Sequence, residues 1–184
     1  MKSSWTDRIA AEPAAAAAGA VFVLSLATLA GAWFFEYVIR LAPCPLCLEQ
    51  RIPYHVIIPF SLLLAIAALA RAPRKLLIVG FAAIAIAACC NVVLGMYHAG
   101  VEWHWWAGPA DCSGPLTDLR SGGSLIDQLH GVHVVRCDEA AWRFLGLSLA
   151  GYNVLISLVL AMISGFGLLA ARGAAGLARS AASA

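Results

Sequence analysis

Charged residues are scarce in this chain: Asp, Glu, Lys and Arg make up only 12% of its 184 residues. A soluble domain of this length needs a polar surface, and the sequence holds too little polar material to build one. The basic residues are also few, and membrane topology accounts for their placement, so nucleic acid is not expected as a partner. Hydrophobic residues make up 62% of the chain, a composition that predicts a protein embedded in a lipid bilayer.

Four apolar runs are about long enough to cross a bilayer, which takes roughly 20 residues in a helix. They cover residues 14–35, 53–70, 76–97 and 147–171. Backbone polar groups must find hydrogen-bond partners within the bilayer, so each run is predicted to form a helix. The whole chain is predicted to form a single all-α membrane domain, a bundle of four helices. Pro53 and Pro59 are expected to bend the second helix. A cleaved signal peptide is the alternative for the first run, which is however longer than the usual hydrophobic core of such a peptide.

Charge is distributed unequally between the two sides of the predicted bundle. The N-terminal tail, the 71–75 connection and the C-terminal tail carry seven basic and two acidic residues, whereas the opposite side carries five basic and eight acidic residues. Basic short segments mark the cytoplasmic face. Both termini are therefore expected in the cytoplasm, and the loops 36–50 and 98–146 on the outer side.

The two outer loops contain four of the six cysteines: Cys44, Cys47, Cys112 and Cys137. Thiols outside the cytoplasm can stay oxidised, so the two pairs are predicted to form disulfides. Cys89 and Cys90 fall inside the third run, where a cysteine behaves as a small inert hydrophobe.

The stretch LAPCPLCLEQR, residues 41–51, has the spacing of a redox-active dithiol. If the second helix begins near Pro45 or Leu46, Cys47 lies in its first turn, where free backbone N–H groups and the helix dipole favour a thiolate. Arg51 follows one turn later, on the same face. Its charge would stabilise that thiolate and attract an anionic oxygen of a bound acceptor. The alternative for Arg51 is a side chain that only reaches the membrane interface.

Two other uses of the Cys44–Cys47 pair are not supported. Covalent haem attachment needs a histidine directly after the second cysteine, and Leu48 is there. Structural zinc needs two further ligands, which His98, His104 or Cys112 could offer, but no second closely spaced ligand pair exists. The sequence therefore predicts no metal site.

The second outer loop holds Cys112 and Cys137, which lie 25 positions apart. The pattern of apolar residues over 123–135 predicts a short helix on the membrane surface. A purely structural disulfide that closes the long loop is one interpretation. Beside a redox-active pair, however, a second disulfide can also exchange with the first and pass electrons without a metal.

Three features together resemble the disulfide bond formation protein B (DsbB) family of four-span membrane thiol oxidases. They are PCPLCLEQR after the first run, the separated Cys112 and Cys137, and CDEAAWRFLGLSLAGYN, residues 137–153, which leads into the fourth run. The resemblance implies a bacterial inner-membrane protein whose cysteine loops face the periplasm. It also implies that the protein re-oxidises a thioredoxin-fold thiol oxidase of the DsbA type and passes the electrons to ubiquinone or menaquinone.

The resemblance also implies a role for each residue. Cys112, paired with Cys137, would be attacked by the soluble partner, and Cys137 would then attack Cys44. Cys47, released as a thiolate, would pass electrons to a quinone held near Arg51. Family members have an acid–histidine arrangement at the outer end of the third span, where this chain reads MYHAGVEWHWW.

His98 matches that arrangement with a one-residue ambiguity and is the candidate quinone neighbour, the alternative being an interfacial histidine without a role. Two competing functions are kept. A vitamin K epoxide reductase-like enzyme is disfavoured because its C-x-x-C follows the loop cysteines, and a non-catalytic membrane scaffold would contain inert disulfides.

Overall fold

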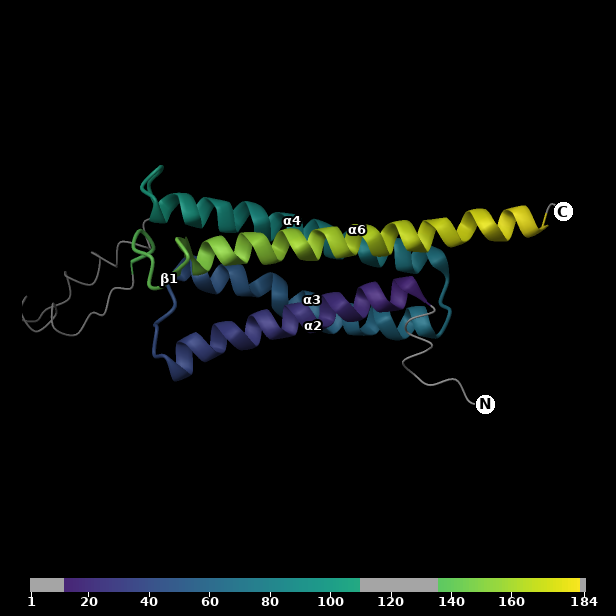
Figure 1. The fold of residues 1–184 in the computed structure, drawn as a ribbon, viewed down its shortest axis with the longest axis horizontal. Coiled ribbons are helices and arrows are strands. Elements are labelled where there is room, and N and C mark those ends of the chain that lie inside the picture. Colours follow the sequence, from purple (N-terminus) through teal and green to yellow (C-terminus); the bar gives the residue numbers. More distant parts are fainter. Residues whose placement is uncertain (1–11, 110–135, 183–184) are drawn as a thin grey trace, which may run out of the picture.

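The computed structural model describes residues 12–109 and 136–182, with side chains up to residue 172. Four long helices dominate this part of the chain: α2 (Pro13–Trp33), α3 (Pro45–Leu69), α4 (Arg74–Glu102) and α6 (Leu149–Ala182) (Figure 1). All four are long and apolar enough to cross a membrane. The predicted all-α four-helix membrane bundle is therefore confirmed. The short surface helix predicted over 123–135 lies outside the described residues.

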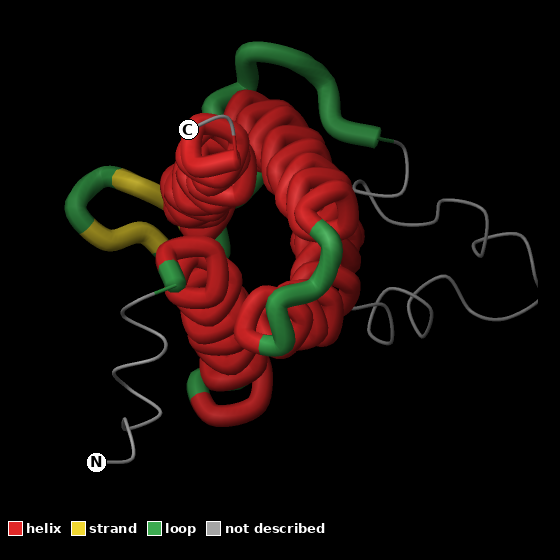
Figure 2. Tube along the Cα trace, turned by 90° about the vertical axis from the view of Figure 1, so that its right-hand side faces the viewer, coloured by secondary structure: helices red, strands yellow, loops and turns green. Residues whose placement is uncertain are grey.

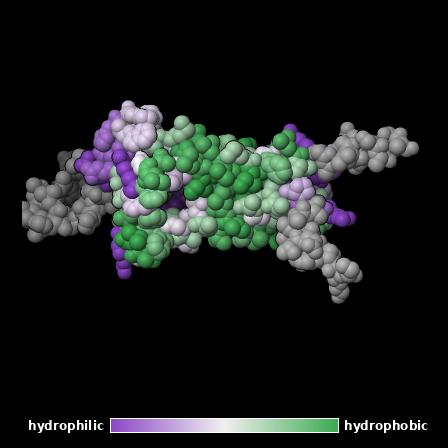
Figure 3. Space-filling model, in the orientation of Figure 1, coloured by the Kyte–Doolittle hydropathy of each residue, from purple (hydrophilic) through white to green (hydrophobic). Residues whose placement is uncertain are grey.

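The helices form a ring in which each packs against two neighbours. α2 and α4 lie opposite one another, and each contacts both α3 and α6 (Figure 2). α2 begins and α6 ends at the same end of the bundle, where α3 also connects to α4 (Figure 1). Figure 3 shows one face of the molecule, with hydrophobic residues across its middle and polar residues toward the two ends. The hydrophobic part is the surface that lipid would contact.

Two helices extend well beyond the predicted apolar runs at the outer end of the bundle, and α6 does so at the other end, where it continues to Ala182. α3 begins at Pro45, so residues 45–50, which were assigned to the first loop, belong to the helix. α4 continues to Glu102, past the predicted end at residue 97. The added turns contain Gln50, His98 and Glu102, all of which are buried. In the sequence these polar residues flank the apolar runs, Gln50 before the second and the other two after the third. In the fold they pack between helices at the outer end of the bundle.

A short hairpin precedes α6 and was not predicted. Strand β1 (Arg143–Phe144) pairs antiparallel with β2 (Leu147–Ser148). Leu145 and Gly146 form the two-residue turn, and both have positive φ angles, 49° and 82°. Two positive φ angles are the geometry that suits a tight hairpin. Because the strands use residues up to Ser148, the fourth helix starts at Leu149 rather than at residue 147.

Small residues let the helices approach closely, as is usual for membrane bundles. The side of α2 that faces the bundle carries Ala14, Ala15, Ala17 and Ala18, all buried. On α6, Gly167 receives the fully buried ring of Phe81 from α4, since a Cβ built at Gly167 would lie only 2.3 Å from that ring. Cys89 and Cys90, predicted to be inert within the third span, lie on the exposed outer surface of α4.

Candidate active site

The first turn of α3 brings the two cysteines of the C-x-x-C motif together. Cys44 is the N-cap residue, and its sulfur accepts a hydrogen bond from the backbone N–H of Cys47 at 3.2 Å. Pro45 follows at a position where a missing N–H costs nothing. Cys47 therefore lies in the first helical turn. This is the position at which the sequence predicts that the helix start favours a Cys47 thiolate.

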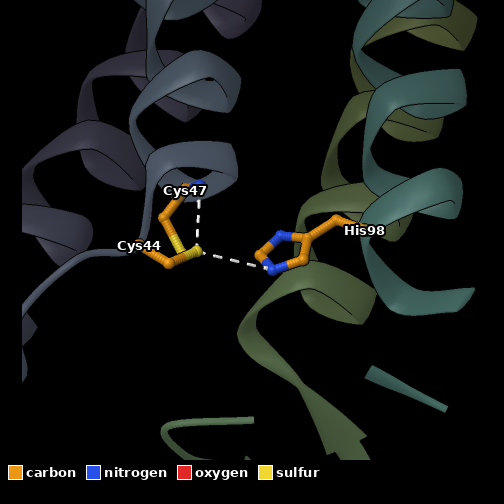
Figure 4. Close-up of side chains that lie close together, drawn as sticks. All are labelled: Cys44, Cys47 and His98. Carbon is orange, nitrogen blue, oxygen red and sulfur yellow. Dashed lines mark hydrogen bonds between the residues drawn. The ribbon is translucent and has the colours of Figure 1, made fainter. Parts of the chain in front are cut away.

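The structure shows Cys44 and Cys47 as free thiols, whereas the sequence predicted that this pair can be a disulfide. Their sulfurs lie 2.6 Å apart (Figure 4). Cys44 is only 4% exposed, and Cys47 is half-buried. The hydrogen bond to Cys47, together with burial, raises the pKa of the Cys44 thiol. The proton of the reduced pair is therefore held on Cys44, which leaves Cys47 as the sulfur that carries the negative charge.

His98 on α4 points at the sulfur of Cys44 across the bundle (Figure 4). Its Nε2 lies 3.5 Å from Cys44 Sγ, and its Nδ1 accepts a hydrogen bond of 2.6 Å from the amide nitrogen of Gln50. The imidazole is 2% exposed. Glu102, one turn further along α4, places Oε1 3.8 Å from His98 Nε2. The other oxygen of this buried carboxylate, Oε2, has no hydrogen-bond partner in the described part of the chain.

Arg51 on α3 forms an ion pair with Glu36. Glu36 belongs to a π-helical segment, η1 (Phe34–Val38), that continues α2 at the outer end of the bundle. Both side chains are largely shielded from solvent, at 15% and 21% exposure. The pair ties α3 to α2 and fixes the guanidinium about one helical turn from Cys47.

A chain of buried side-chain hydrogen bonds continues from Gln50 into the bundle. The amide of Asn153 on α6 donates to Gln50 Oε1 at 2.6 Å, and its oxygen accepts from the Tyr54 hydroxyl at 2.6 Å. Asn91 on α4 donates to Asn153 at 3.3 Å and to Ser157 at 3.1 Å. Three helices are thereby joined by polar contacts that have little competition from water.

A cavity of about 570 Å³ lies beside the C-x-x-C motif, between α2, α3 and α6. Its wall is mostly apolar, with contributions from Phe35, Trp142 and Ile156. The polar residues that line it include Cys47, Arg51 and His98. A largely apolar pocket of a few hundred Å³ with a small set of convergent polar groups is the usual form of a small-molecule site.

The two cysteines of the motif have different neighbours. Cys47 lines the cavity. Cys44 does not line it and belongs to a cluster of buried side chains that also contains Val101 and Cys137, and the half-buried Cys47 packs against this cluster from outside. Cys137 is 0% exposed and is bonded in a disulfide. Cys112, its partner by sequence prediction, lies outside the described residues. Cys137 and the motif cysteines thus share one region of the fold, and Cys47 is the one that also lines the cavity.

The structure brings together five of the six residues that the sequence singled out: Cys44, Cys47, Arg51, His98 and Cys137. Sequence reasoning missed the partners that hold them, namely Glu36, Gln50, Glu102 and Asn153. Asn91 and Asn153 could have been found, because a polar side chain within an apolar run is costly in lipid and so points to a contact between helices. The pairing of Glu36 with Arg51 has no such signal.

Comparisons with known proteins agree with this arrangement. The family model described as "Disulfide bond formation protein DsbB" matches residues 14–167. A "Disulfide bond formation protein B" of Marinobacter nauticus is 30% identical over 156 residues, which cover 78% of this chain and 86% of that protein. The protein of the same name from Stutzerimonas stutzeri is 32% identical over 142 residues, or 73% and 82% of the two chains.

A further relative, "Uncharacterized protein RP370" of Rickettsia prowazekii, is 28% identical over 148 residues, or 79% of this chain and 82% of that protein. No solved structure gives a significant match.

Four membrane-spanning helices with a C-x-x-C pair at a helix start, beside an apolar cavity, are the arrangement of a membrane thiol–disulfide oxidoreductase. The chain belongs to the DsbB family, as the cysteine pattern predicts. It is thus a multi-pass membrane protein of disulfide bond formation.

Proposed function

We propose that the protein re-oxidises a periplasmic thioredoxin-fold dithiol oxidase of the DsbA type and transfers the electrons to a membrane quinone. The observation that carries this proposal is the different placement of the two motif cysteines. Cys47 lines the apolar cavity, and Cys44 shares a buried cluster with Cys137. One sulfur is therefore available to an acceptor in the membrane, while the other is available to the second disulfide.

In this proposal the partner's thiolate attacks Cys112, and the bond between Cys112 and Cys137 breaks. The thiolate of Cys137 then attacks Cys44 and forms a bridge between the loops, which releases Cys47 as a thiolate. The positive end of the α3 dipole and Arg51 would stabilise that leaving group, and a stabilised thiolate leaves faster. The partner's second thiol would then displace Cys112 from the mixed disulfide made in the first step. The freed Cys112 thiolate would attack Cys137, which restores that disulfide and releases Cys44 from the bridge. The two electrons and two protons of the partner's dithiol would then reside on Cys44 and Cys47, and their transfer to a quinone would restore the second disulfide.

The cavity fits a quinone headgroup in size and chemistry. It is largely apolar, and Arg51 and His98 line it together with Cys47. A bound quinone would supply the acceptor for two electrons and two protons. Arg51 would hold an anionic oxygen of the ring, and Phe35 and Trp142 would pack against its apolar parts. Ubiquinone and menaquinone both suit this wall.

The proposed orientation places the C-x-x-C end in the periplasm and both termini in the cytoplasm of a bacterial inner membrane. Its support is the excess of basic residues at the end of the bundle where the termini lie. That orientation puts the C-x-x-C end of the bundle on the side where a secreted partner is present.

The test is quinone reduction by purified protein with a reduced DsbA-type partner. We expect one quinone reduced per partner disulfide formed, with either a short-chain ubiquinone or a menaquinone analogue. Cys47→Ser should abolish quinone reduction, whereas the double variant Cys89→Ser/Cys90→Ser, altered on the outer face of α4, should match the wild type. Full activity in Cys47→Ser would refute the proposal.

A further inference from the structure

The sulfur atoms of Cys44 and Cys47 and Nε2 of His98 form a compact group of metal-binding atoms. All three lie within 4.8 Å of one another, although His98 is more than 50 residues from the cysteines and belongs to another helix. Figure 4 shows the imidazole facing the two sulfurs across the bundle. Thiolate sulfur and imidazole nitrogen are the donors that Zn²⁺ prefers in proteins.

The spacing of these atoms is close to that of a tetrahedral zinc site. Zn–S bonds of about 2.3 Å and Zn–N bonds of about 2.0 Å put sulfur and nitrogen about 3.5 Å apart and two sulfurs about 3.8 Å apart. Cys44 Sγ and His98 Nε2 already lie 3.5 Å apart. The two sulfurs, at 2.6 Å, must separate by about 1 Å. Rotation of the half-buried Cys47 side chain can supply that movement.

A carboxylate stands next to these three donors. Glu102 is 6% exposed, and its Oε1 lies 3.8 Å from His98 Nε2. Its Oε2 has no hydrogen-bond partner among the described residues. A buried carboxylate oxygen without a partner is costly, and a divalent cation at the neighbouring sulfurs would compensate its charge.

Gln50 determines which nitrogen of His98 is available. With the amide nitrogen of Gln50 at Nδ1, the proton of a neutral imidazole is on Nε2, facing Cys44. Rotation of the Gln50 amide by half a turn would place its oxygen at Nδ1, which would then hold the proton and leave Nε2 free to bind a metal. The amide of Asn153, which donates to Gln50 Oε1 at 2.6 Å, must rotate with it so that its oxygen faces the Gln50 nitrogen. A hydrogen bond from the second ring nitrogen to an oxygen is usual for histidines that bind zinc.

We propose that the reduced Cys44–Cys47 pair and His98 form a binding site for a Zn²⁺-like divalent cation, and that the disulfide form of the pair does not bind it. Binding releases the thiol protons and changes no oxidation state. The bound thiolates cannot form a disulfide until the cation leaves, so the cation inhibits the reduced enzyme. The binding step depends on geometry alone, whereas the inhibition rests on the proposed function. This cation is a reversible inhibitor and not the structural zinc that the sequence argues against.

Binding is tested by titrating the reduced protein with Co²⁺, which reports thiolate ligands by a charge-transfer band and tetrahedral geometry by its visible bands. A Cys112→Ser/Cys137→Ser background removes the second cysteine pair as a source of thiolates. We expect one Co²⁺ per protein, displaced by Zn²⁺, and no signal from the oxidised protein. Cys89→Ser/Cys90→Ser, added to this background, is the matched control and should leave the titration unchanged.

The role of His98 is tested with His98→Ala and His98→Gln in the same background, each checked for wild-type thermal stability. Both should weaken Zn²⁺ binding by about tenfold or more, and Glu102→Gln should weaken it less. Unchanged affinity in the folded His98 variants would overturn the three-donor site. The same conclusion follows if the oxidised protein binds Co²⁺ as well as the reduced protein does.

Inhibition is measured separately with the Cys112 and Cys137 pair intact. Zn²⁺ added to reduced protein should slow oxidation of the partner, and a chelator should restore the rate. Binding without inhibition would overturn the regulatory part and leave the proposed function in place. Inactivity in metal-free buffer would instead contradict the proposed function, while the Co²⁺ titration would still decide the site.

Discussion

Arg51 and Glu36 form an ion pair at the cavity, between the first turns of α3 and the π-helical end of α2. Because both side chains are mostly shielded from solvent, the carboxylate fixes the position of the guanidinium more firmly than an exposed pair would. π-Helical turns are often found at functional sites, and here the turn supplies the residue that holds the proposed quinone-binding arginine.

Glu36→Gln is therefore expected to weaken quinone binding. The guanidinium keeps its charge but loses the partner that orients it, so the KM for quinone should rise several-fold with a smaller change in kcat. The measurement is steady-state quinone reduction at saturating reduced partner. Glu49→Gln, which removes an exposed carboxylate from α3, the helix of Arg51, should leave KM unchanged. An equal rise in both variants would show that general charge, and not the pair, is responsible.

The two cysteines of the reduced pair should differ in their reaction with iodoacetamide. Cys44 is buried, and the hydrogen bond to Cys47, together with burial, raises the pKa of its thiol. Since only the thiolate reacts, Cys44 should remain slow through about pH 9, where an ordinary cysteine is already largely ionised. Cys47 should be modified first.

Peptide mass spectrometry of briefly alkylated protein measures this selectivity at several pH values. The raised pKa predicts that Cys44 labelling increases only at the alkaline end of the series. Cys44 labelling equal to that of Cys47 at pH 7 would contradict the assignment of the charge to Cys47.

Apolar runs and helix-start signals predicted much of this fold, because lipid requires every spanning segment to satisfy its own backbone. The first turn of α3 could also be predicted from local sequence. Pro45 suits a helix start, and a helix that starts there places Cys47 in its first turn and Arg51 one turn later. The contact between Cys44 and His98 could not be predicted from the sequence. Their sequence separation is large, and only the packing of α4 beside α3 brings them to 3.5 Å.

The polar ends of the helices were misread for a related reason. Gln50 and Glu102 lie outside the apolar runs, so hydropathy assigns them to loops, although both are buried in helices. Their burial depends on partners from other helices, such as Asn153, which no local pattern contains. The site is therefore less predictable than the bundle that carries it.

Close packing of α4 on α6 depends on Gly167. A Cβ at this position would lie 2.3 Å from the ring of Phe81, which is fully buried, so a methyl group there would require the ring or the helix to shift. Gly167→Ala should therefore lower the free energy of unfolding by about 1–3 kcal/mol. Gly165→Ala is the matched control, since a Cβ there has no atom within 4 Å. Thermal unfolding in detergent should show a lower Tm for Gly167→Ala only, and equal Tm values would contradict this packing.

Asn153 should contribute to both stability and activity because it joins three helices. Asn153→Ala removes hydrogen bonds to Gln50, Tyr54 and Asn91. Bonds between membrane helices average about 0.6 kcal/mol, so a loss of about 2 kcal/mol in the free energy of unfolding is expected.

The same change frees Gln50, which positions His98 beside Cys44, so partner oxidation should slow even at temperatures where the variant is fully folded. Ser164→Ala removes a buried hydroxyl that bonds only within α6, to the carbonyl of Leu160, and serves as the control. Thermal unfolding and quinone reduction are measured on both variants. A destabilised but fully active Asn153→Ala would show that the network supports the bundle without positioning the redox pair.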